Sequence, residues 1–201
     1  MDFRLRETDT LVFDVGNVLL TFEPEKVASL LPERHRQALS RALFGPDWRW
    51  SAFDLGVETN EAIAQSVADA AGVPDGKDMV LSAFYGFYRT MKPLPLYTLL
   101  PSLKSMGKRL FALTNFGEPA FSSACEAFPN LHLLDGVVVS AREKVCKPDP
   151  AIFALLIERF GVSPTDALFI DDSLPNVQSA MSIGFKTWHY AGDDILSVSE
   201  C

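Results

Sequence analysis

Five short, mostly apolar runs constrain the fold of this chain most. Each has four or five residues rich in β-branched or aromatic types, and the runs lie at residues 10–13, 109–113, 136–139, 167–170 and 186–190. A strand with one solvated face alternates polar and apolar residues, whereas a strand buried on both faces does not. The runs therefore predict a parallel β-sheet that is covered by helices on both sides.

Helical patterns separate most of these runs. Residues 95–106, 148–160 and 176–182 carry apolar residues at helical spacing, and Gly107, Gly161 and Gly184 supply the stops. Alternation of strands and helices is typical of an α/β doubly wound sheet. We therefore expect a Rossmann-like core of three layers, helix on sheet on helix.

The interval between the first two runs is too long for a simple crossover. It takes up nearly half of the chain, although a crossover needs only about a dozen residues beyond its strands. No buried strand is evident there, and helices are predicted at residues 25–31, 33–44, 59–71 and 76–90, with Thr59 as an N-cap. We expect a helical cap at residues 19–92, inserted into a core formed by residues 1–18 and 93–201.

Composition excludes several classes of function. The 18 Lys and Arg residues against 26 Asp and Glu residues give a net charge of -8, which disfavours nucleic acids and anionic membranes as partners. The three cysteines, Cys125, Cys146 and Cys201, form no C-x-x-C pair, as is typical of a reducing compartment. Residues 1–10 lack a signal-peptide pattern and no apolar stretch approaches about 18 residues. We expect a cytoplasmic protein, either a monomer or a homodimer.

Polar residues follow the predicted strands at their carboxyl ends. Asp14 follows the first run, Thr114-Asn115 the second and Asp171-Asp172 the fourth, and Lys147 lies a short loop after the third. Ligands of open α/β sheets bind at this edge. The sequence thus predicts one site that combines carboxylates, a hydroxyl and an ammonium group.

These residue types suit phosphoryl transfer. A carboxylate such as Asp14 can attack phosphorus and form an aspartyl-phosphate. Asp14 with Asp171 or Asp172 would make an oxygen site suited to Mg²⁺, which offsets the negative charge of the phosphate. Thr114 and the backbone amide of Asn115 can donate hydrogen bonds to phosphate oxygens.

Two lysines compete for the role of balancing the remaining charge and keeping Asp14 ionised. Lys144 and Lys147 both follow the third run. Lys147 opens a Lys-Pro-Asp-Pro turn at residues 147–150, and this context favours it over Lys144.

Four segments, in order along the chain, resemble the motifs of the haloacid dehalogenase superfamily. They are Leu-Val-Phe-Asp-Val-Gly-Asn-Val-Leu-Leu at 11–20, Leu-Thr-Asn at 113–115, Lys-Pro-Asp-Pro at 147–150 and Phe-Ile-Asp-Asp-Ser-Leu-Pro-Asn at 169–176. The helical insertion looks like the C1-type cap of that superfamily. The Asp-Val-Gly-Asn of the first motif resembles the subgroup typified by bacterial α-glucose-1-phosphate phosphatase.

The resemblance implies a magnesium site at the carboxyl edge of the sheet. Asp14 would be both the nucleophile and a metal ligand, and the carbonyl oxygen of Gly16 a second ligand. Asp172 would bind Mg²⁺ directly, and Asp171 would bind it directly or through water.

The same resemblance implies a phosphate site beside the metal. Thr114 and Asn115 would bind the phosphate, with Gly16 and Asn176 lining the substrate side, and Asn176 would orient nearby groups. Lys147 would be the catalytic lysine of the core.

One position departs from the family pattern. Phosphatases of this superfamily usually carry a second Asp two residues after the nucleophile, which protonates the leaving group and then activates water; this chain has Gly16 there. The proton transfers must then fall to water, to a cap residue or to nothing. General acid–base help is worth about 10²–10⁴-fold in rate, so its loss would slow the reaction unless the leaving group is good. Hydrolysis of a sugar 1-phosphate would be slowed less, because the anomeric alcohol that leaves is somewhat acidic.

We therefore expect a Mg²⁺-dependent phosphatase acting on a small phosphorylated metabolite, with sugar phosphates as one candidate class. A 2-haloacid dehalogenase, which needs no metal and generally lacks the acidic pair, is the alternative hydrolase. A non-catalytic binding protein of the same family is the alternative from another class. In the cap, Trp48, Trp50 and Asp54 are the candidates to line the substrate side.

Overall fold

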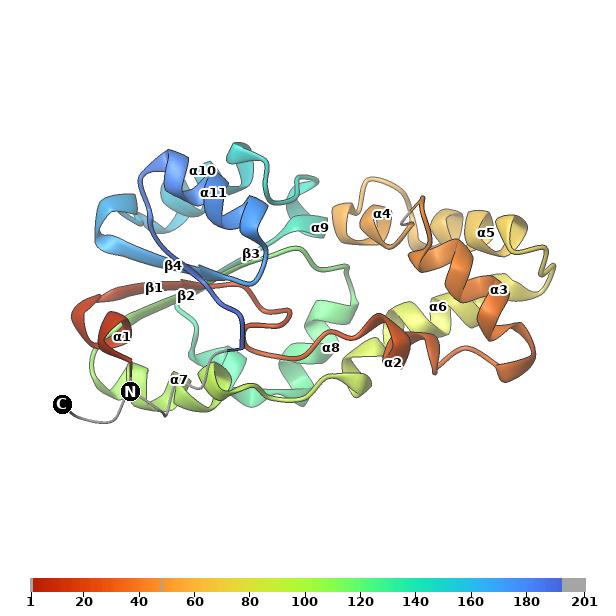
Figure 1. Cartoon of the computed structure of the whole chain (residues 1–201), viewed down its shortest axis with the longest axis horizontal. Coiled ribbons are helices and arrows are strands. Elements are labelled where there is room, and N and C mark those ends of the chain that lie inside the picture. Colours follow the sequence, from red (N-terminus) through yellow and green to blue (C-terminus); the bar gives the residue numbers. More distant parts are fainter. Residues whose placement is uncertain (1, 48, 193–201) are drawn as a thin grey trace.

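The computed structural model describes residues 2–47 and 49–192. Its centre is a five-stranded parallel sheet in the order β3-β2-β1-β4-β5, with β1 in the middle (Figure 1). The strands are β1 (Thr10–Phe13), β2 (Arg109–Thr114), β3 (Gly136–Val139), β4 (Ala167–Asp171) and β5 (Lys186–His189). All five predicted strands are confirmed, to within one residue at either end.

Helices cover both faces of this sheet, which confirms the three-layer α/β fold. One face packs against α10 (Pro150–Phe160) and α11 (Leu174–Ile183); the other packs against α1 (Phe3–Glu7), α7 (Pro95–Ser105) and α8 (Ala120–Ala127). In β1, Val12 faces the first layer while Leu11 and Phe13 face the second. A central strand therefore needs apolar residues at every position, which is why its sequence does not alternate.

Helical turns also fill several loops around the sheet. The short helix α9 (Ser140–Glu143) follows β3 directly, and single 3₁₀ turns lie at Pro129–Leu133 and Pro164–Asp166. The sequence predicted neither α1 nor α8 nor α9. The longest described helix, α3, has 12 residues. No helix in the described ranges is long and apolar enough to cross a membrane.

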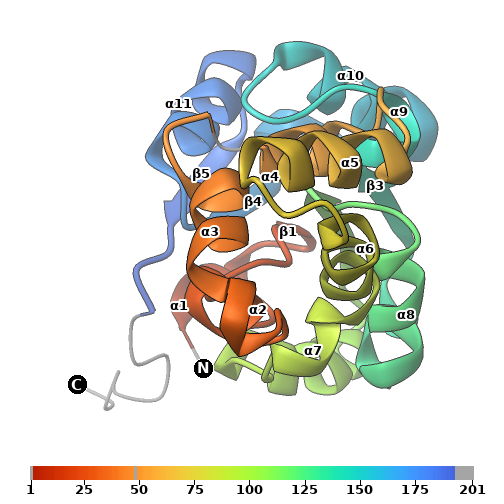
Figure 2. The same ribbon diagram turned by 90° about the vertical axis from the view of Figure 1, so that its right-hand side faces the viewer.

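The segment between β1 and α7 is helical, as predicted, and no described residue of it belongs to a strand of the sheet. It contains α2 (Pro24–Ala28), α3 (Glu33–Phe44), α4 (Trp50–Leu55), α5 (Asn60–Ala70), α6 (Gly76–Gly86) and a 3₁₀ turn, η1 (Phe87–Thr90). Thr59 caps α5 as expected, since its Oγ1 accepts a hydrogen bond from the Ala62 amide. The short helix α4 was not predicted. Figure 2 shows these helices in front of the sheet when it is viewed end-on.

The two connections of this segment to the core run side by side. The Thr21 amide donates to the Lys92 carbonyl at 2.9 Å, and the Leu94 amide donates to the Leu19 carbonyl at 2.9 Å. The segment therefore leaves and re-enters the core at one point. We propose residues 19–92 as the cap and residues 1–18 with 93–201 as the core.

Candidate active site

Asp14 lies at the carboxyl end of the central strand. Its amide continues the ladder with a hydrogen bond to the Ile170 carbonyl at 2.9 Å. Its Oδ1 accepts from the Val15 amide at 2.7 Å and ion-pairs with Lys147 Nζ at 2.9 Å. The carboxylate is thus held in one orientation at the rim of the sheet.

Lys147 lies between two carboxylates. Its Nζ is 2.7 Å from Asp171 Oδ2 as well as 2.9 Å from Asp14 Oδ1, and the whole residue is only 4% exposed. Asn115 holds the lysine backbone: its Oδ1 accepts from the Lys147 amide at 2.8 Å, and its Nδ2 donates to the Lys147 carbonyl at 3.0 Å. This pairing of a side chain with a backbone explains how a loop lysine is held next to Asp14.

Lys144, the competing lysine, points elsewhere. Its Nζ donates to the carbonyl oxygens of Gly56 and Ala141, at the contact between the cap and the core. The structure therefore brings Lys147, and not Lys144, next to Asp14.

The acidic pair after β4 divides into two environments. Asp171 is fully buried and accepts from the Ser173 amide at 2.8 Å and from Asn176 Nδ2 at 3.0 Å. Asp172 is half-buried at the cavity and accepts from Asn17 Nδ2 at 3.2 Å. Together with Asp14 and Lys147, these residues (Asp171, Asp172 and Asn176) form the strand-end cluster.

Asn17 is a site residue that the sequence analysis missed. Its Nδ2 contacts Asp172, while its Oδ1 accepts from the Phe22 amide at 2.8 Å, so it links the acidic pair to the start of the cap. Its φ of 55° lies in the left-handed region, which Asn tolerates better than most residues. Its place beside Gly16, in the same short motif as Asp14, was the available signal.

The three carboxylates form a hard oxygen site. Asp14, Asp171 and Asp172 each offer a ligand atom within 4.8 Å of the others, a donor set that suits Mg²⁺. Burial raises the pKa of Asp14 to about 7, with the charge of Asp171 adding to the rise and Lys147 opposing it. Burial also raises the pKa of Asp172. A divalent cation would relieve this crowding of negative charge, so the donor set fits the ion.

Lys147 stays charged within the cluster. Burial works to lower its pKa, but the negative charges of Asp14 and Asp171 outweigh burial and raise the pKa above that of an ordinary lysine. The lysine is therefore a permanent positive charge beside Asp14 at neutral pH.

Thr114 ends β2 with a buried hydroxyl. The residue is fully buried, and in the part of the chain that the structure describes its Oγ1 has no hydrogen-bond partner. Buried polar atoms normally have a partner, because an unmade hydrogen bond costs about 1–3 kcal/mol. This orphaned hydroxyl at the end of β2 is a candidate ligand-binding group, but Thr114 is not among the residues that line the active-site cavity.

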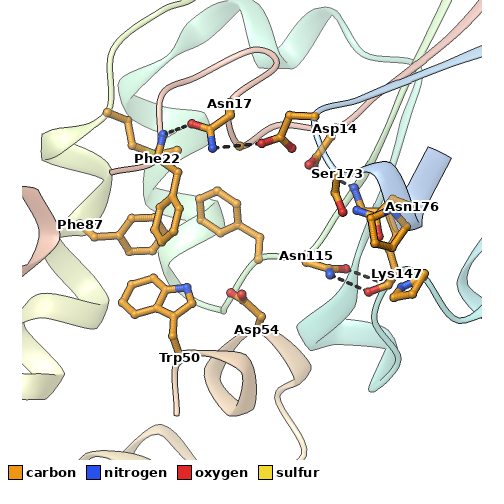
Figure 3. Close-up of a pocket in the computed structure, with 16 residues that line it drawn as sticks. Asp14, Asn17, Phe22, Trp50, Asp54, Phe87, Asn115, Lys147, Ser173 and Asn176 are labelled. Atoms are coloured by element: carbon orange, nitrogen blue, oxygen red, sulfur yellow. Dashed lines mark hydrogen bonds and ion pairs between the residues drawn. The ribbon is translucent and has the colours of Figure 1, made fainter. Parts of the chain in front are cut away.

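The strand-end cluster opens into a cavity of about 450 Å³. Asp14, Gly16, Asp172, Lys147 and Asn176 line one side, together with Asn115. The opposite side is an aromatic wall made of Phe22, Trp50, Phe87 and Phe116. Figure 3 shows rings of this wall facing the polar side across the cavity.

Residues from four places in the chain build the aromatic wall. The Trp50 ring centroid lies 5.4 Å from that of Phe22 and 5.1 Å from that of Phe87, and Phe87 lies 5.0 Å from Phe116. Trp50 and Asp54, predicted from the cap sequence, both line the cavity. The third cap candidate, Trp48, lies outside the described residues.

The sequence matches the haloacid dehalogenase-like hydrolase family over residues 8–184. This span covers four of the five strands, β1 to β4, together with the inserted helices, and it carries all of the cavity-lining residues. The fold and the strand-end acids define a hydrolase of the α/β class with an insertion after its first strand. The chain belongs to the haloacid dehalogenase-like hydrolase family.

Individual relatives are distant but cover nearly the whole chain. The fructose-1-phosphate phosphatase YqaB of Escherichia coli is 28% identical over 183 residues, covering 87% of this chain and 92% of its own length. The sesquiterpene phosphatase astK of Aspergillus oryzae is 24% identical over 179 residues, covering 89% of this chain and 87% of its own.

A solved structure shows the same fold. The HAD family enzyme bt-2542 of Bacteroides thetaiotaomicron, in complex with magnesium and inorganic phosphate, superimposes with a TM-score of 0.75 at 23% identity. The match covers 93% of this chain and 96% of the other.

Proposed function

We propose that this protein is a Mg²⁺-dependent phosphatase that hydrolyses a small phosphorylated metabolite through an aspartyl-phosphate on Asp14. The observation that carries the proposal is the strand-end cluster, in which one oriented carboxylate faces a cavity between a buried lysine and two further acids. The phosphatase names of two relatives, and the phosphate and magnesium bound to a protein of the same fold, support it.

The chemistry follows from the position of each group. An Asp14 carboxylate oxygen attacks phosphorus while the bond to the leaving oxygen breaks, and water then hydrolyses the aspartyl-phosphate and regenerates Asp14. Lys147 fixes the orientation of Asp14 and favours its ionised form through its positive charge.

Other residues bind and align. Thr114 and Asn115 are assigned to the phosphate, and Asn176 orients Asp171 through its amide. Mg²⁺ would be held by Asp14, Asp172 and the Gly16 carbonyl, with Asp171 direct or through water. The ion supplies charge neutralisation that lets a carboxylate approach an anionic phosphate.

We place the substrate among small organic phosphates, with sugar phosphates as the first class to test. The cavity volume of about 450 Å³ suits a metabolite of that size, and the fructose-1-phosphate phosphatase is a relative over nearly its whole length. The Asp-Val-Gly-Asn motif supports membership of the α-glucose-1-phosphate phosphatase subgroup. We also infer a reducing, cytoplasmic setting, supported by the sparse and unpatterned cysteines.

A phosphate-release screen over sugar phosphates, nucleotides and other phosphoesters, with Mg²⁺ and with chelator, tests this function. We expect turnover only with the metal, and a loss of at least about 10³-fold in Asp14→Asn, because the nucleophile is gone. Asp9→Asn is the matched control, since the Asp9 side chain is 99% exposed. Full activity in chelator, or a loss of less than about tenfold in Asp14→Asn, would overturn the mechanism. Release of halide from 2-haloacids without metal would instead indicate a dehalogenase.

A further inference from the structure

A phosphatase with Gly16 in place of the usual acid needs another source of protons. Three acids line the cavity among the described residues, namely Asp14, Asp54 and Asp172. Asp14 and Asp172 belong to the strand-end cluster, where both are candidate metal ligands. Asp54 is the remaining one, and the cap contributes it through α4. Its carboxyl group points into the cavity beneath the aromatic wall (Figure 3).

Although Asp54 belongs to the cap, the core holds its backbone in place. Ser140 Oγ, fully buried at the start of α9, donates to the Asp54 carbonyl at 2.5 Å. The same hydroxyl accepts from the Phe116 amide at 2.9 Å. Asp54 is therefore tied to the loops after β2 and β3, which border the active site.

Gly56 brings α4 unusually close to the core. It has a φ of +66°, and a Cβ at this position would lie 2.6 Å from the Ala141 carbonyl oxygen, so only glycine permits the contact. Lys144 Nζ donates to the Gly56 carbonyl. The C-terminal end of α4, two residues after Asp54, is thus held against α9. This contact fixes the position of Asp54 relative to the core.

The surroundings of Asp54 suit a group that gives up a proton and takes it back. The Trp50 side chain favours the ionised form of the carboxyl group and so works to lower its pKa. The ionisable groups that act on it electrostatically are Asp14, Lys147 and the Cys146 thiol. Burial, helped by the charge of Asp14, raises its pKa well above that of an ordinary aspartate, although Lys147 and Trp50 act in the opposite direction. An acid catalyst at neutral pH needs such a shift.

We propose that Asp54 is the general acid and base of this enzyme, delivered by the cap in place of the acid missing at position 16; this inference rests on the proposed phosphatase function. As Asp14 attacks phosphorus, the bond from phosphorus to the leaving oxygen breaks. The proton of the Asp54 carboxyl group moves to that oxygen and the alcohol departs. Asp54, now a carboxylate, takes a proton from the water that attacks the aspartyl-phosphate. Phosphate leaves, and both aspartates return to their starting states.

The leaving group decides how much the acid matters. p-Nitrophenolate is a weak base and leaves without being protonated, whereas an alkyl alcohol needs a proton in order to leave. For Asp54→Asn we expect kcat/KM for an alkyl phosphate to fall about 10²–10⁴-fold, and kcat/KM for p-nitrophenyl phosphate to fall less than about tenfold. Asn keeps the shape of the side chain and an oxygen for Trp50. Asp54→Glu should restore part of the loss.

The base role gives a second readout. Without a base, hydrolysis of the aspartyl-phosphate slows, so Asp54→Asn should release one equivalent of p-nitrophenolate in a burst and accumulate phosphorylated protein. Wild-type protein should show neither. Replacing a residue that merely supports the fold would lower kcat/KM for both substrates alike and give no burst.

Asp78→Asn is the matched control, because Asp78 is an exposed cap aspartate on α6 outside the cavity. An equal loss for both substrates, or no loss for either, would overturn the inference while leaving the phosphatase proposal intact. A wild-type chain that releases no phosphate overturns both proposals. Thermal melting checks the fold, and Asp54→Ser replaces Asp54→Asn if the latter melts early.

Discussion

The two sides of the cavity are built on opposite principles. In the strand-end cluster, Lys147 lies between Asp14 and Asp171, and Asn176 donates a hydrogen bond to Asp171. On the aromatic wall, rings pack against rings in tilted or edge-on geometry, and Asp54 is the acid beside them. Under the proposed function, the polar side would carry out the step that is common to all phosphate esters. The wall is where the part of the substrate that differs between esters would lie.

The difference also concerns how each side is held. The strand-end cluster rests on hydrogen bonds between loops of the core, such as the pair joining Asn115 to Lys147. The cap side depends on docking of α4 against α9, through Ser140 and Gly56. The strand-end cluster is therefore sensitive to the loss of a charged side chain, and the cap side to the loss of a contact between α4 and α9.

Removing the central charge should have the largest effect. Lys147→Met leaves the buried Asp14 and Asp171 carboxylates without their counter-charge, so we expect the free energy of unfolding to fall by about 3–5 kcal/mol. Lys144→Met, which removes hydrogen bonds at the cap–core contact, should cost only about 1 kcal/mol. Urea denaturation at pH 8 with chelator measures both. Equal costs would contradict the contrast between the two sides.

The next effect is a pH dependence of stability in metal-free protein. Because burial raises the pKa of Asp14 from 3.8 to about 7, the unfolded chain releases this proton first as pH rises. The stabilisation from protonated Asp14 is therefore fully present below about pH 4 and is lost as pH climbs to about 7. Each pKa unit corresponds to about 1.4 kcal/mol.

Asp14→Asn removes this dependence. Between about pH 4 and pH 7, the free energy of unfolding of wild type should fall by a few kcal/mol relative to that of Asp14→Asn. Denaturation in chelator measures this difference. Asp9→Asn, at an exposed side chain, is the control for the substitution itself. A constant difference between Asp14→Asn and wild type would show that Asp14 ionises normally.

Moving the acid from the cap to the core should give a smaller gain. A Cβ at Gly16 would meet only Phe22 Cβ, at the ordinary distance of 3.8 Å, so Gly16→Asp fits. Added to Asp54→Asn, it should raise kcat/KM for an alkyl phosphate at least about tenfold. If the double variant is no faster than Asp54→Asn alone, a carboxyl group at position 16 cannot replace that of Asp54.

The smallest expected effect comes from Trp50→Phe. An aromatic ring stays, but the indole N–H, through which Trp50 favours ionised Asp54, is lost. The pKa of Asp54 should then rise, moving the alkaline limb of the kcat/KM profile up by less than about one pH unit. Phe44→Leu, at a neighbouring ring 5.2 Å from Trp50, is the control and should leave the limb in place. A downward shift of the limb would contradict this influence of Trp50 on the pKa of Asp54.

The strand-end cluster was predictable because its signals are local. Strands buried on both faces show as unbroken apolar runs, and Asp14, Thr114 and Asp171 sit at the ends of three of them. The turn that Lys147 opens is also visible in the sequence. What the sequence did not reveal is the pairing of the Asn115 side chain with the Lys147 backbone, since that depends on two loops meeting in space.

The cap side was harder to predict for physical reasons. Helix α4 has only six residues, bounded by Gly-Pro at residues 45–46 and by Gly56, which is too short for a periodic signal. The aromatic wall draws Phe22, Trp50 and Phe87 from different elements, so no spacing unites them. Trp50 and Asp54 were identified as candidates, but their common cavity emerges only from the packing.

The paired connections at Leu19–Leu94 and Thr21–Lys92 have an evolutionary and engineering consequence. An insertion whose two ends meet can be exchanged for another of different length without moving any strand, because the core has only one gap to close. Since that gap opens a few residues after Asp14, a graft there would replace Asp54 and most of the aromatic wall in one event. Recombination at these two connections would thus replace the cap side of the cavity in a single step and leave Asp14 and the rest of the strand-end cluster in place.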